Sequence, residues 1–453
     1  MSLSMIRRRQ ALQLLGSAAI VPLALRIRPA LAQTPVASLI VLSDLHSAYE
    51  RSAQLLAAVA AEISGNAAPH AILINGDIFE LGNVVATRSA GVVDWKLLER
   101  LAALAPTVLN IGNHEPDLIN DLAEVIAKAR SLGVTVVSNI GDKRTGAPYT
   151  DASAQIEIGG LKLSLVGIAT NAINTYPKAT REMMDIPEPA EWAQANLAAN
   201  LADGSLPVVL SHAGVVADRA ILPLLADGSL LIGGHDHLIL SHNEGKTLYL
   251  HTGSWSSLFT VVDITADRSL SARRVDIATD APADAELAAL IEATLAEHLT
   301  DEEKAAVGAS AKAQTLGESA RFVAETMAKA TDADVGFIGH TTFGTGFPAG
   351  PVSKYAFDAV VRFEGKLVVT EVSKAVLGEL IARSNQDGDI PLTARTGDFL
   401  YASPVELADK ANYRIVTGDW PAMNQKAYFG REDLAFTEVP DLRIKALVAQ
   451  ALS

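Results

Sequence analysis

The most informative absence in this sequence is cysteine, of which there is none in 453 residues. Disulfides, thiolate metal sites and a cysteine nucleophile are therefore excluded, while the redox compartment stays open. Aromatic residues make up only 5% of the chain, and no low-complexity tract interrupts it. No apolar run reaches the roughly 20 residues that a membrane-spanning helix needs. The remaining composition is that of a globular protein, and the length suits two domains with full cores.

The N-terminus has the pattern of an export signal. Three consecutive Arg at 7–9 precede a short apolar run over 11–25, and Ala-Leu-Ala at 30–32 forms an A-x-A cleavage site. The segment RRQAL at 8–12 resembles the twin-arginine signal, which exports proteins already folded. We therefore expect residues 1–32 to be removed, and the mature protein to be soluble and periplasmic with no membrane contact.

Acidic side chains outnumber basic ones, 52 to 37, and give a formal net charge of −15. The predicted signal carries five Arg and no acid, so its loss makes the charge more negative still. So acidic a surface argues against a nucleic-acid polymer or an anionic membrane as a partner. An anionic small molecule would need cations concentrated locally, and metal ions are one way to supply them.

The first part of the chain alternates apolar and amphipathic runs, the pattern of an α/β layer structure. Its predicted strands are 37–43, 71–75, 106–111, 207–211 and 229–232, and its predicted helices lie near 50–64, 93–105, 117–132 and 190–202. The segment QIEIGGLKLSLVGI predicts a hairpin that turns on Gly159 and Gly160. This domain spans residues 33–278.

The second part begins with an Ala- and Glu-rich stretch, residues 279–308, which predicts a helical linker. A smaller α/β domain over 309–453 follows. We predict a helix near 317–330, a strand at 334–338, a Gly- and Thr-rich loop at 339–350, a strand near 366–371, a helix at 372–384 and a strand at 412–416.

Candidate metal ligands follow each of the five predicted strands of the first domain at the point where the strand ends. They are Asp44 and His46, then Asp77, Asn113 and His114, His212, and finally His235 and His237. Ligands in open α/β sheets bind outside the carboxyl ends of strands, so these side chains should converge. A strand-end Asp or His can also cap a helix or form a turn, but five such coincidences favour a single site.

The residue types in this set point to metal chemistry. Carboxylates, imidazoles and an amide oxygen suit Mn, Fe, Zn, Mg or Ca, and they are too many for one ion. One carboxylate, Asp77, would bridge two divalent ions. Two ions about 3.5–4 Å apart clamp the attacking and leaving oxygens of an in-line displacement at phosphorus.

The motifs D-x-H, G-D, G-N-H-E, H and G-H-x-H, in this order, resemble the binuclear metallophosphoesterase (calcineurin-like) superfamily. The variant N-H-E-x-D, the signal and the second domain resemble its periplasmic 5'-nucleotidase / UDP-sugar hydrolase branch, over most of residues 37–450. The resemblance implies a four-layer αββα metallophosphoesterase domain joined by a helical linker to a smaller α/β domain that sets specificity. It also implies a small-molecule phosphoester as substrate and a metal-bound hydroxide as nucleophile.

The resemblance assigns roles residue by residue. Site one would use Asp44, His46, Asp77 and His237, and site two would use Asp77, Asn113, His212 and His235. His114 would stabilise the transition state or protonate the leaving oxygen, and Asp117 would keep its imidazole charged and aimed. Glu115 should support the loop, and His251 either supports the site from behind or only packs.

The second domain departs from the family pattern. Phe363 and Trp420 match the two aromatic residues that sandwich a base in the family, although both could instead be core aromatics. The family loop N-x-G-G-I-R is replaced by GHTTFGTGFPAG over 339–350, which leaves His340 as a candidate substrate contact without the Asn or the Arg. The Gly-Gly-Asp expected after the second aromatic is also missing, so 5'-nucleoside monophosphates should be poor or atypical substrates.

Three functions remain open on the sequence alone. The first is a periplasmic dimetal phosphoesterase that acts on a nucleotide or a nucleotide-like small molecule. The second is a hydrolase similar to the sulfur-oxidation thiosulfohydrolases, which share the two-domain plan and a signal peptide. The third is a metal- or nucleotide-binding protein that has lost turnover, against which the intact His114 and Asp117 argue.

Overall fold

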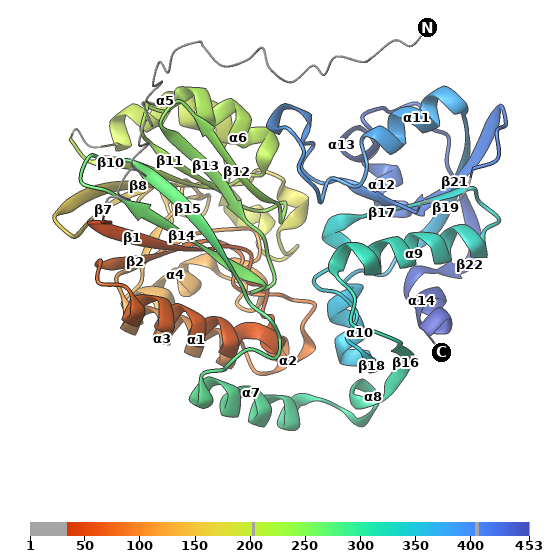
Figure 1. Cartoon of the computed structure of the whole chain (residues 1–453), viewed down its shortest axis with the longest axis horizontal. Coiled ribbons are helices and arrows are strands. Elements are labelled where there is room, and N and C mark those ends of the chain that lie inside the picture. The colour runs from red at the N-terminus through yellow and green to blue at the C-terminus, as the bar shows by residue number, and fades with distance from the viewer. Residues whose placement is uncertain (1–33, 202–203, 404–406, 453) are drawn as a thin grey trace, which may run out of the picture. The chain divides into compact units, whose positions relative to one another are not determined.

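The computed structural model describes residues 34–201, 204–403 and 407–452. The predicted signal at 1–32 lies outside the described residues. Residues 35–453 form one compact unit, and Figure 1 shows how its sheets and helices follow one another along the chain. The predicted boundaries at residues 278 and 308 remain predictions.

The first six-stranded sheet carries the strands that precede Asp44, Asp77 and Asn113. Its order is β15 (Leu270–Asp276), β14 (Leu258–Ile264), β1 (Ala37–Leu42), β2 (His70–Asn75), β3 (Thr107–Asn110) and β4 (Thr135–Val137). Strands β1 to β4 are parallel, whereas β14 and β15 are antiparallel additions at one edge. Every residue of β1 and β2 is buried, as their near-continuous apolar sequences predict.

The second six-stranded sheet carries the strands that precede the remaining candidate ligands. Its order is β12 (Ile239–Glu244), β13 (Thr247–Thr252), β11 (Leu230–Gly233), β10 (Leu206–His212), β8 (Leu161–Ala169) and β7 (Ser153–Ile158). The inner four strands are parallel, and β7 and β12 are antiparallel edges. The predicted hairpin is confirmed, because Gly159 and Gly160 turn between β7 and β8 with φ of 56° and 77°.

The two sheets pack face to face and helices cover their outer faces. Leu39 and Val41 of β1 share one buried cluster with Leu165 of β8 and Val208 of β10, so an apolar layer lies between the sheets. The helices that pack on the first sheet are α1 (Tyr49–Gly65), α3 (Val92–Leu104) and α4 (Leu122–Ser131), and α7 (Ala285–His298) packs against α1 and α3 from outside. Helices α5 (Pro189–Asn200) and α6 (Val215–Ile221) pack on the second sheet. The predicted αββα arrangement is therefore confirmed (Figure 1).

The short elements of this region are the helix α2 (Val84–Arg88) and a small three-stranded sheet. That sheet contains β5 (Gly141–Asp142), β6 (Ala147–Pro148) and β9 (Met184–Asp185). Helix α4 begins later than predicted, because Asp121 caps its first turn by accepting a hydrogen bond from the backbone N–H of Ala123.

The predicted helical linker is wrong in part. Helix α7 ends at His298, and Thr300 starts the separate short helix α8 (Asp301–Lys304) through a capping box with Glu303. Residues Ala306–Ser310 then form strand β16, which pairs with β18 (Gly350–Ser353). Composition cannot predict this change from helix to strand, because the pairing partner is about 40 residues away in the chain.

The C-terminal residues form a five-stranded sheet flanked by helices. Its order is β20 (Leu400–Ala402), β17 (Val335–Gly339), β21 (Asn412–Gly418), β19 (Lys366–Ser373) and β22 (Thr437–Arg443). The helices are α9 (Leu316–Ala330), α10 (Lys354–Val360), α11 (Lys374–Ala382), α12 (Asp419–Met423), α13 (Gln425–Phe429) and α14 (Ile444–Leu452). The predicted smaller α/β fold is confirmed.

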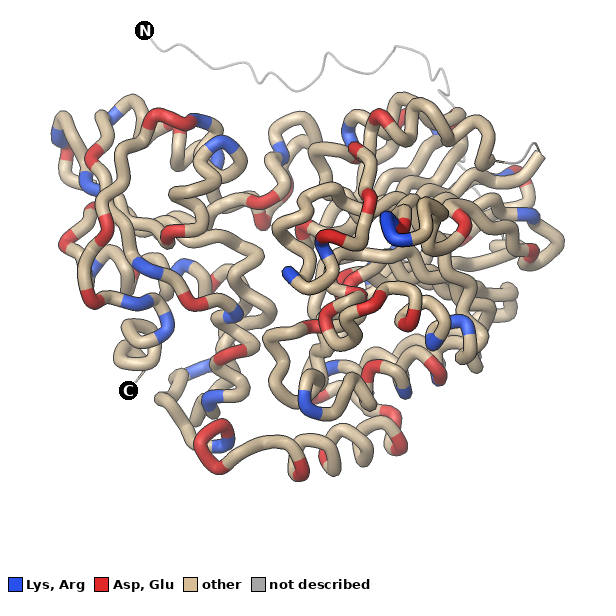
Figure 2. The backbone as a smooth tube through the Cα atoms, turned by 180° about the vertical axis from the view of Figure 1, so that it is seen from behind, with Lys and Arg blue, Asp and Glu red and all other residues tan. Residues whose placement is uncertain are grey.

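Figure 2 shows that acidic and basic positions are interspersed along the backbone, and Asp and Glu outnumber Lys and Arg in the sequence. None of the helices within the described ranges is long and apolar enough to cross a bilayer.

Candidate metal centre

The candidate ligands converge where the parallel strands of both sheets end. Asp44 and His46 follow β1, Asp77 follows β2, and Asn113 follows β3 in the first sheet. In the second sheet His212 is the last residue of β10, and His235 and His237 follow β11. The structure therefore brings all seven predicted ligands together.

One group of ligand atoms combines Asp44, His46 and His237. The two Nε2 atoms of His46 and His237 are 2.9 Å apart, and Asp44 Oδ1 lies 4.0 Å and 3.7 Å from them. The other oxygen of Asp44 accepts a hydrogen bond from the Ser43 hydroxyl, which fixes the carboxylate. Two facing imidazole nitrogens beside a buried carboxylate form a donor set that fits a divalent cation.

A second group combines Asp77, His212 and His235 with Asn113. His212 Nε2 lies 3.1 Å from Asp77 Oδ2, and its Nδ1 donates to the Asn75 carbonyl oxygen at 2.7 Å. That hydrogen bond leaves Nε2 directed at the site. His235 Nδ1 lies 2.8 Å from Asn113 Oδ1, so both atoms face the same point.

Asp77 lies between the two groups. Its Oδ2 is 3.1 Å from His212 Nε2 and 3.9 Å from His46 Nε2, while its Oδ1 accepts a hydrogen bond from the His114 backbone N–H at 2.8 Å. One carboxylate oxygen is thus anchored to the backbone and the other faces both groups. This is the arrangement that a bridging ligand requires.

Lowered pKa values of two histidines also favour metal binding at the first group. Burial, and then the charge of Arg362, lowers the pKa of His46 to about 4. Burial, and then His46, lowers the pKa of His237 well below its usual range. Both imidazoles are therefore neutral near pH 7, which is the form that binds a metal.

The backbone at the site is unusual. Asp44, His46, Asp77, His235 and His237 all have positive φ, between 51° and 80°. This left-handed conformation costs a non-glycine residue about 1 kcal/mol or more. Contacts with the rest of the fold must therefore hold these five residues in this conformation.

The loop after β3 is held by Glu115 and Gly112. The Glu115 carboxylate accepts hydrogen bonds from the backbone N–H groups of Gly112, Asp77 and Ile78, at 2.6, 3.0 and 2.9 Å. A Cβ on Gly112 would lie 2.3 Å from Asp77 Oδ1, so only glycine fits. Glu115 supports the loop, as the sequence predicts.

His114 points into the site without belonging to either group above. Its Nδ1 lies 2.7 Å from Asp117 Oδ2, which also accepts a hydrogen bond from the Leu81 backbone N–H at 2.7 Å. Its ring centroid is 4.8 Å from that of His46. Burial opposes protonation of His114, but Asp117 and then Asp77 outweigh it and raise the pKa of His114 to about 10. A protonated imidazole is thereby held beside the metal ligands.

Replacement of Asp117 by Asn is expected to move the alkaline limit of turnover to lower pH. A reaction that needs protonated His114 is lost as the pH rises through the pKa of that group, and Asp117 raises this pKa. Without the carboxylate, the loss should begin at least about one pH unit lower. The measurement is kcat between pH 6 and 10 for both proteins, and coincident alkaline limbs would contradict the assignment of His114.

A buried charged network lies behind the loop that carries His235 and His237. His251 Nε2 lies 3.0 Å from Asp218 Oδ2, and its Nδ1 lies 3.2 Å from Oδ1 of Asp236. Burial opposes the charge on His251, but Asp236 and Asp218 raise its pKa to about 9. Of the two alternatives for His251, these contacts favour support of the site from behind, and its place at the end of the segment LYLH is the signal in the sequence.

Sequence reasoning missed Glu80, which lies in the segment FELGN. Its side chain is buried, and its Oε2 lies 3.3 Å from His46 Nδ1. Glu80, His114 and Asp117 also have carboxylate and imidazole atoms within 4.8 Å of one another. A lone Glu in a loop gives no signal in the sequence.

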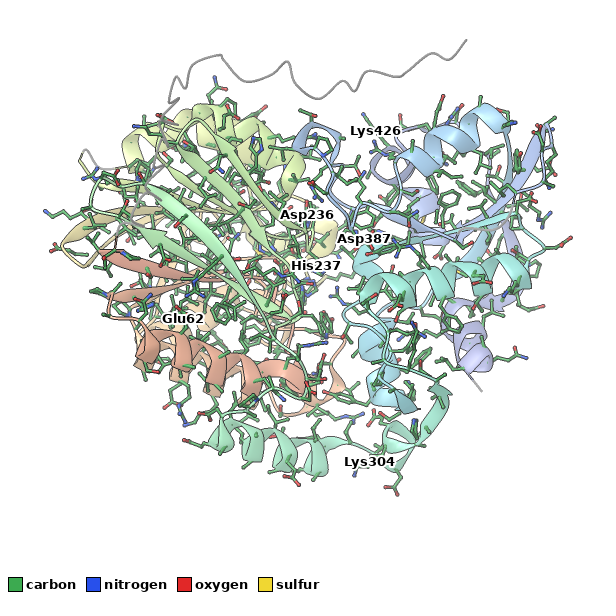
Figure 3. All side chains as sticks on the ribbon, viewed as in Figure 1. Glu62, Asp236, His237, Lys304, Asp387 and Lys426 are labelled. Atoms are coloured by element: carbon green, nitrogen blue, oxygen red, sulfur yellow. The ribbon has the colours of Figure 1, made fainter. Side chains whose placement is uncertain are left out.

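The predicted substrate residues lie in the C-terminal part. Phe363 and Trp420 are 50% and 48% exposed, so neither is the core aromatic that the alternative interpretation described. His340 is buried instead: its Nε2 donates to the Asp236 carbonyl oxygen at 2.6 Å, and its Nδ1 accepts from the Phe399 backbone N–H at 3.2 Å. Both ring nitrogens are occupied, so we leave His340 out of the proposed substrate site. Figure 3 labels Asp236 and His237 on the side of the first domain that faces the C-terminal elements.

Comparison with known proteins agrees with this geometry. The family model described as calcineurin-like phosphoesterase matches residues 37–238. These residues are a calcineurin-like phosphoesterase domain. Domains of this family are metal-dependent phosphoester hydrolases that use two divalent ions, and the ligand groups of this phosphoesterase domain could hold them.

Solved structures show the same fold for nearly the whole chain. The 5'-nucleotidase precursor from Thermus thermophilus is 18% identical with a TM-score of 0.58, and the match covers 92% of this chain and 96% of that chain. The sulfate thiohydrolase SoxB of the same organism is 15% identical with a TM-score of 0.63, and covers 92% and 94%. The 5'-nucleotidase from Candida albicans is 14% identical with a TM-score of 0.58, and covers 92% and 98%. Among curated proteins, no sequence matches significantly.

Proposed function

We propose that the protein is a periplasmic dimetal phosphoesterase that hydrolyses a phosphoester of a nucleotide or a nucleotide-like small molecule. The observation that carries the proposal is the position of Asp77 between two groups of ligand atoms, with His114 and its partner Asp117 beside them. The periplasmic location rests on the signal pattern at residues 1–32.

The proposed roles divide the site between ions and side chains. Site one is Asp44, His46, Asp77 and His237, and site two is Asp77, Asn113, His212 and His235. When bound, two divalent ions would activate a water and withdraw negative charge from the phosphoryl group. His114, held by Asp117, would stabilise charge on the transferred group or give a proton to the leaving oxygen.

The proposed substrate face is built from Phe363 and Trp420. Both rings are half exposed. Phe363 lies just before β19 and Trp420 just after β21, and these two strand ends are paired, Leu367 with Gly418. A flat ring accepts any base by stacking, worth roughly 1–3 kcal/mol. The loop over 339–350 contains no arginine, so it provides no guanidinium to bind an anionic group on the substrate.

Manganese-dependent hydrolysis of p-nitrophenyl phosphate tests the activity, and AMP tests the substrate. We expect AMP to be no better than p-nitrophenyl phosphate, because a missing charge-assisted hydrogen bond costs about 1.5–3 kcal/mol, or roughly ten- to hundredfold in kcat/KM. The measurement is kcat/KM for both substrates and for a cyclic nucleotide, with and without Mn²⁺ after chelation.

The outcomes separate two parts of this proposal. A preference for AMP of a hundredfold or more would show that the altered loop does not weaken nucleotide recognition. An absence of metal-dependent turnover with every phosphoester would overturn the phosphoesterase itself.

A further inference from the structure

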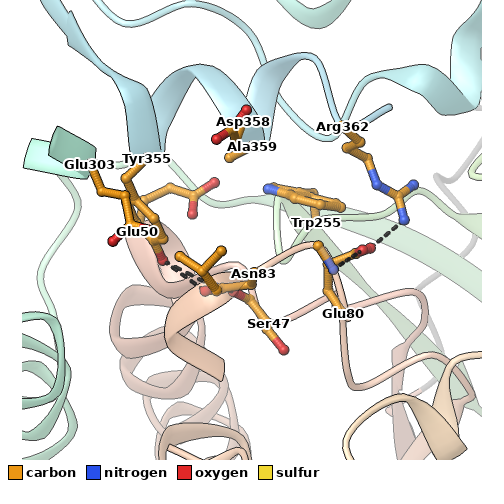
Figure 4. A pocket seen from close by; sticks show the side chains of 12 residues that line it. Ser47, Glu50, Glu80, Asn83, Trp255, Glu303, Tyr355, Asp358, Ala359 and Arg362 are labelled. Carbon is orange, nitrogen blue, oxygen red and sulfur yellow. Dashed lines mark hydrogen bonds and ion pairs between the residues drawn. The ribbon is translucent and has the colours of Figure 1, made fainter. Parts of the chain in front are cut away.

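Arg362 reaches from the C-terminal part of the chain to the edge of the metal centre. It lies two residues after α10, its side chain is 4% exposed, and its Nη2 contacts Oε2 of Glu80 (Figure 4). Its Nη1 donates to the Thr341 carbonyl oxygen at 3.2 Å. The guanidinium also lies over the rings of Trp255 and Phe363, 5.0 and 4.9 Å from their centroids. Such a side chain is held from several sides.

Glu80 contacts both Arg362 and the proposed metal ligand His46. The oxygen that contacts Arg362 also lies 3.3 Å from His46 Nδ1, and the other oxygen accepts a hydrogen bond from the Gly82 backbone N–H at 2.8 Å. The opposite nitrogen of the same imidazole, His46 Nε2, faces His237 at 2.9 Å. Trp255 stacks on the His46 ring with centroids 5.3 Å apart. A series of contacts therefore leads from Arg362 through Glu80 to His46, a ligand of site one.

A second contact from the C-terminal part ends on the same site. His340 donates to the carbonyl oxygen of Asp236, the residue between His235 and His237. Two of the loops that provide ligands for site one are thus braced by residues more than 100 positions later in the chain. Among the described residues, the hydrogen-bond and ion-pair partners of His212 and Asn113 lie between Asp44 and His235, and none comes from the C-terminal part.

We propose that Arg362 is a positioning residue for metal site one, acting through Glu80 to fix the orientation of His46. The proposal rests on the two-metal site of the proposed function. A carboxylate that accepts from the free N–H of a ligating imidazole fixes its tautomer and ring angle, and loss of such a partner costs about 10- to 100-fold in metal affinity. Here the carboxylate is itself held by a planar, permanently charged guanidinium.

The test is metal affinity of the full chain, measured without turnover. Chelated Arg362→Met protein is titrated with Mn²⁺ against a competing chelator, beside the unmodified protein and Arg321→Met. Arg321 is a matched control, because it pairs with Asp387 at 2.9 Å and lies 5.0 Å over the Tyr401 ring, but touches no ligand loop. We expect one of two dissociation constants to rise about 10- to 100-fold in Arg362→Met and the other to change less than about threefold.

A double-mutant cycle with Glu80→Gln shows whether Arg362 acts through Glu80. If it does, the double variant binds about as weakly as the weaker single variant, and Arg362→Lys recovers part of the affinity. Equal weakening of both sites, independent effects of the two substitutions, or unchanged affinity would each overturn the inference. Should Arg362→Met fail to fold, Arg362→Lys and Glu80→Gln carry the same comparison. If the unmodified protein binds fewer than two ions, the proposed function fails instead.

Discussion

Replacement of Asp77 by Asn is expected to remove both divalent ions and to reduce phosphoester hydrolysis by on the order of 10³-fold or more. Asp77 Oδ2 faces His212 at 3.1 Å and His46 at 3.9 Å, one residue from each proposed site. An amide keeps the shape of the side chain but loses the charge that offsets two cations. Each ion supplies several kcal/mol of transition-state stabilisation, and each 1.4 kcal/mol is about a factor of ten in rate.

The measurement is metal content per chain after purification without chelators, together with kcat for p-nitrophenyl phosphate. We expect about two ions in the unmodified protein and fewer than one in the variant. Asp94→Asn is the matched control, because Asp94 is similarly buried and accepts a hydrogen bond from the Tyr49 hydroxyl at 2.7 Å, but belongs to neither group of ligand atoms. One tightly held ion that survives in Asp77→Asn would rule out a bridging role.

Replacement of His114 by Ala is expected to keep both ions and to lower kcat by about 10²- to 10⁴-fold, the usual contribution of a general acid or base. His114 is held by Asp117 at 2.7 Å, and its ring lies beside His46. The ligand atoms of both groups reach one another without it. Its removal therefore takes away a positive charge and a proton donor but no ligand.

Metal content and kcat measured on the same sample distinguish these roles. His242→Ala serves as the control, since this partly buried residue lies on the edge strand β12, away from the ligand loops. Loss of an ion in His114→Ala would make His114 a ligand. An unchanged kcat with both ions in place would remove it from the reaction.

The parts of the fold that the sequence predicts are those with strong local signals. The central strands are apolar on both faces, so β1, β2, β3, β10 and β11 lie within two residues of their predicted ends. Polar residues directly after such strands must emerge at the carboxyl edge of the sheet, which is why all seven ligands could be placed together.

The remaining features depend on contacts between distant segments. No local pattern predicts that Asp44 and His237 adopt a left-handed backbone, because the surrounding fold imposes it. Glu80 and Arg362 meet across 282 positions, and neither lies in a motif. The burial of His340 was not predictable for the same reason: its partners, Asp236 and Phe399, come from segments that the sequence does not place beside it.

The ligands of the two groups come from both sheets, so metal binding should affect the unfolding of the protein. An ion held by Asp44 and His237 would join the end of β1 to the loop after β11, and so would act as a cross-link in a chain that has no cysteine. The unfolded chain cannot present these side chains together, so the binding free energy adds to the stability of the folded state. Chelators should then act as mild denaturants, and exchange of an ion should be slow wherever it requires the two sheets to separate.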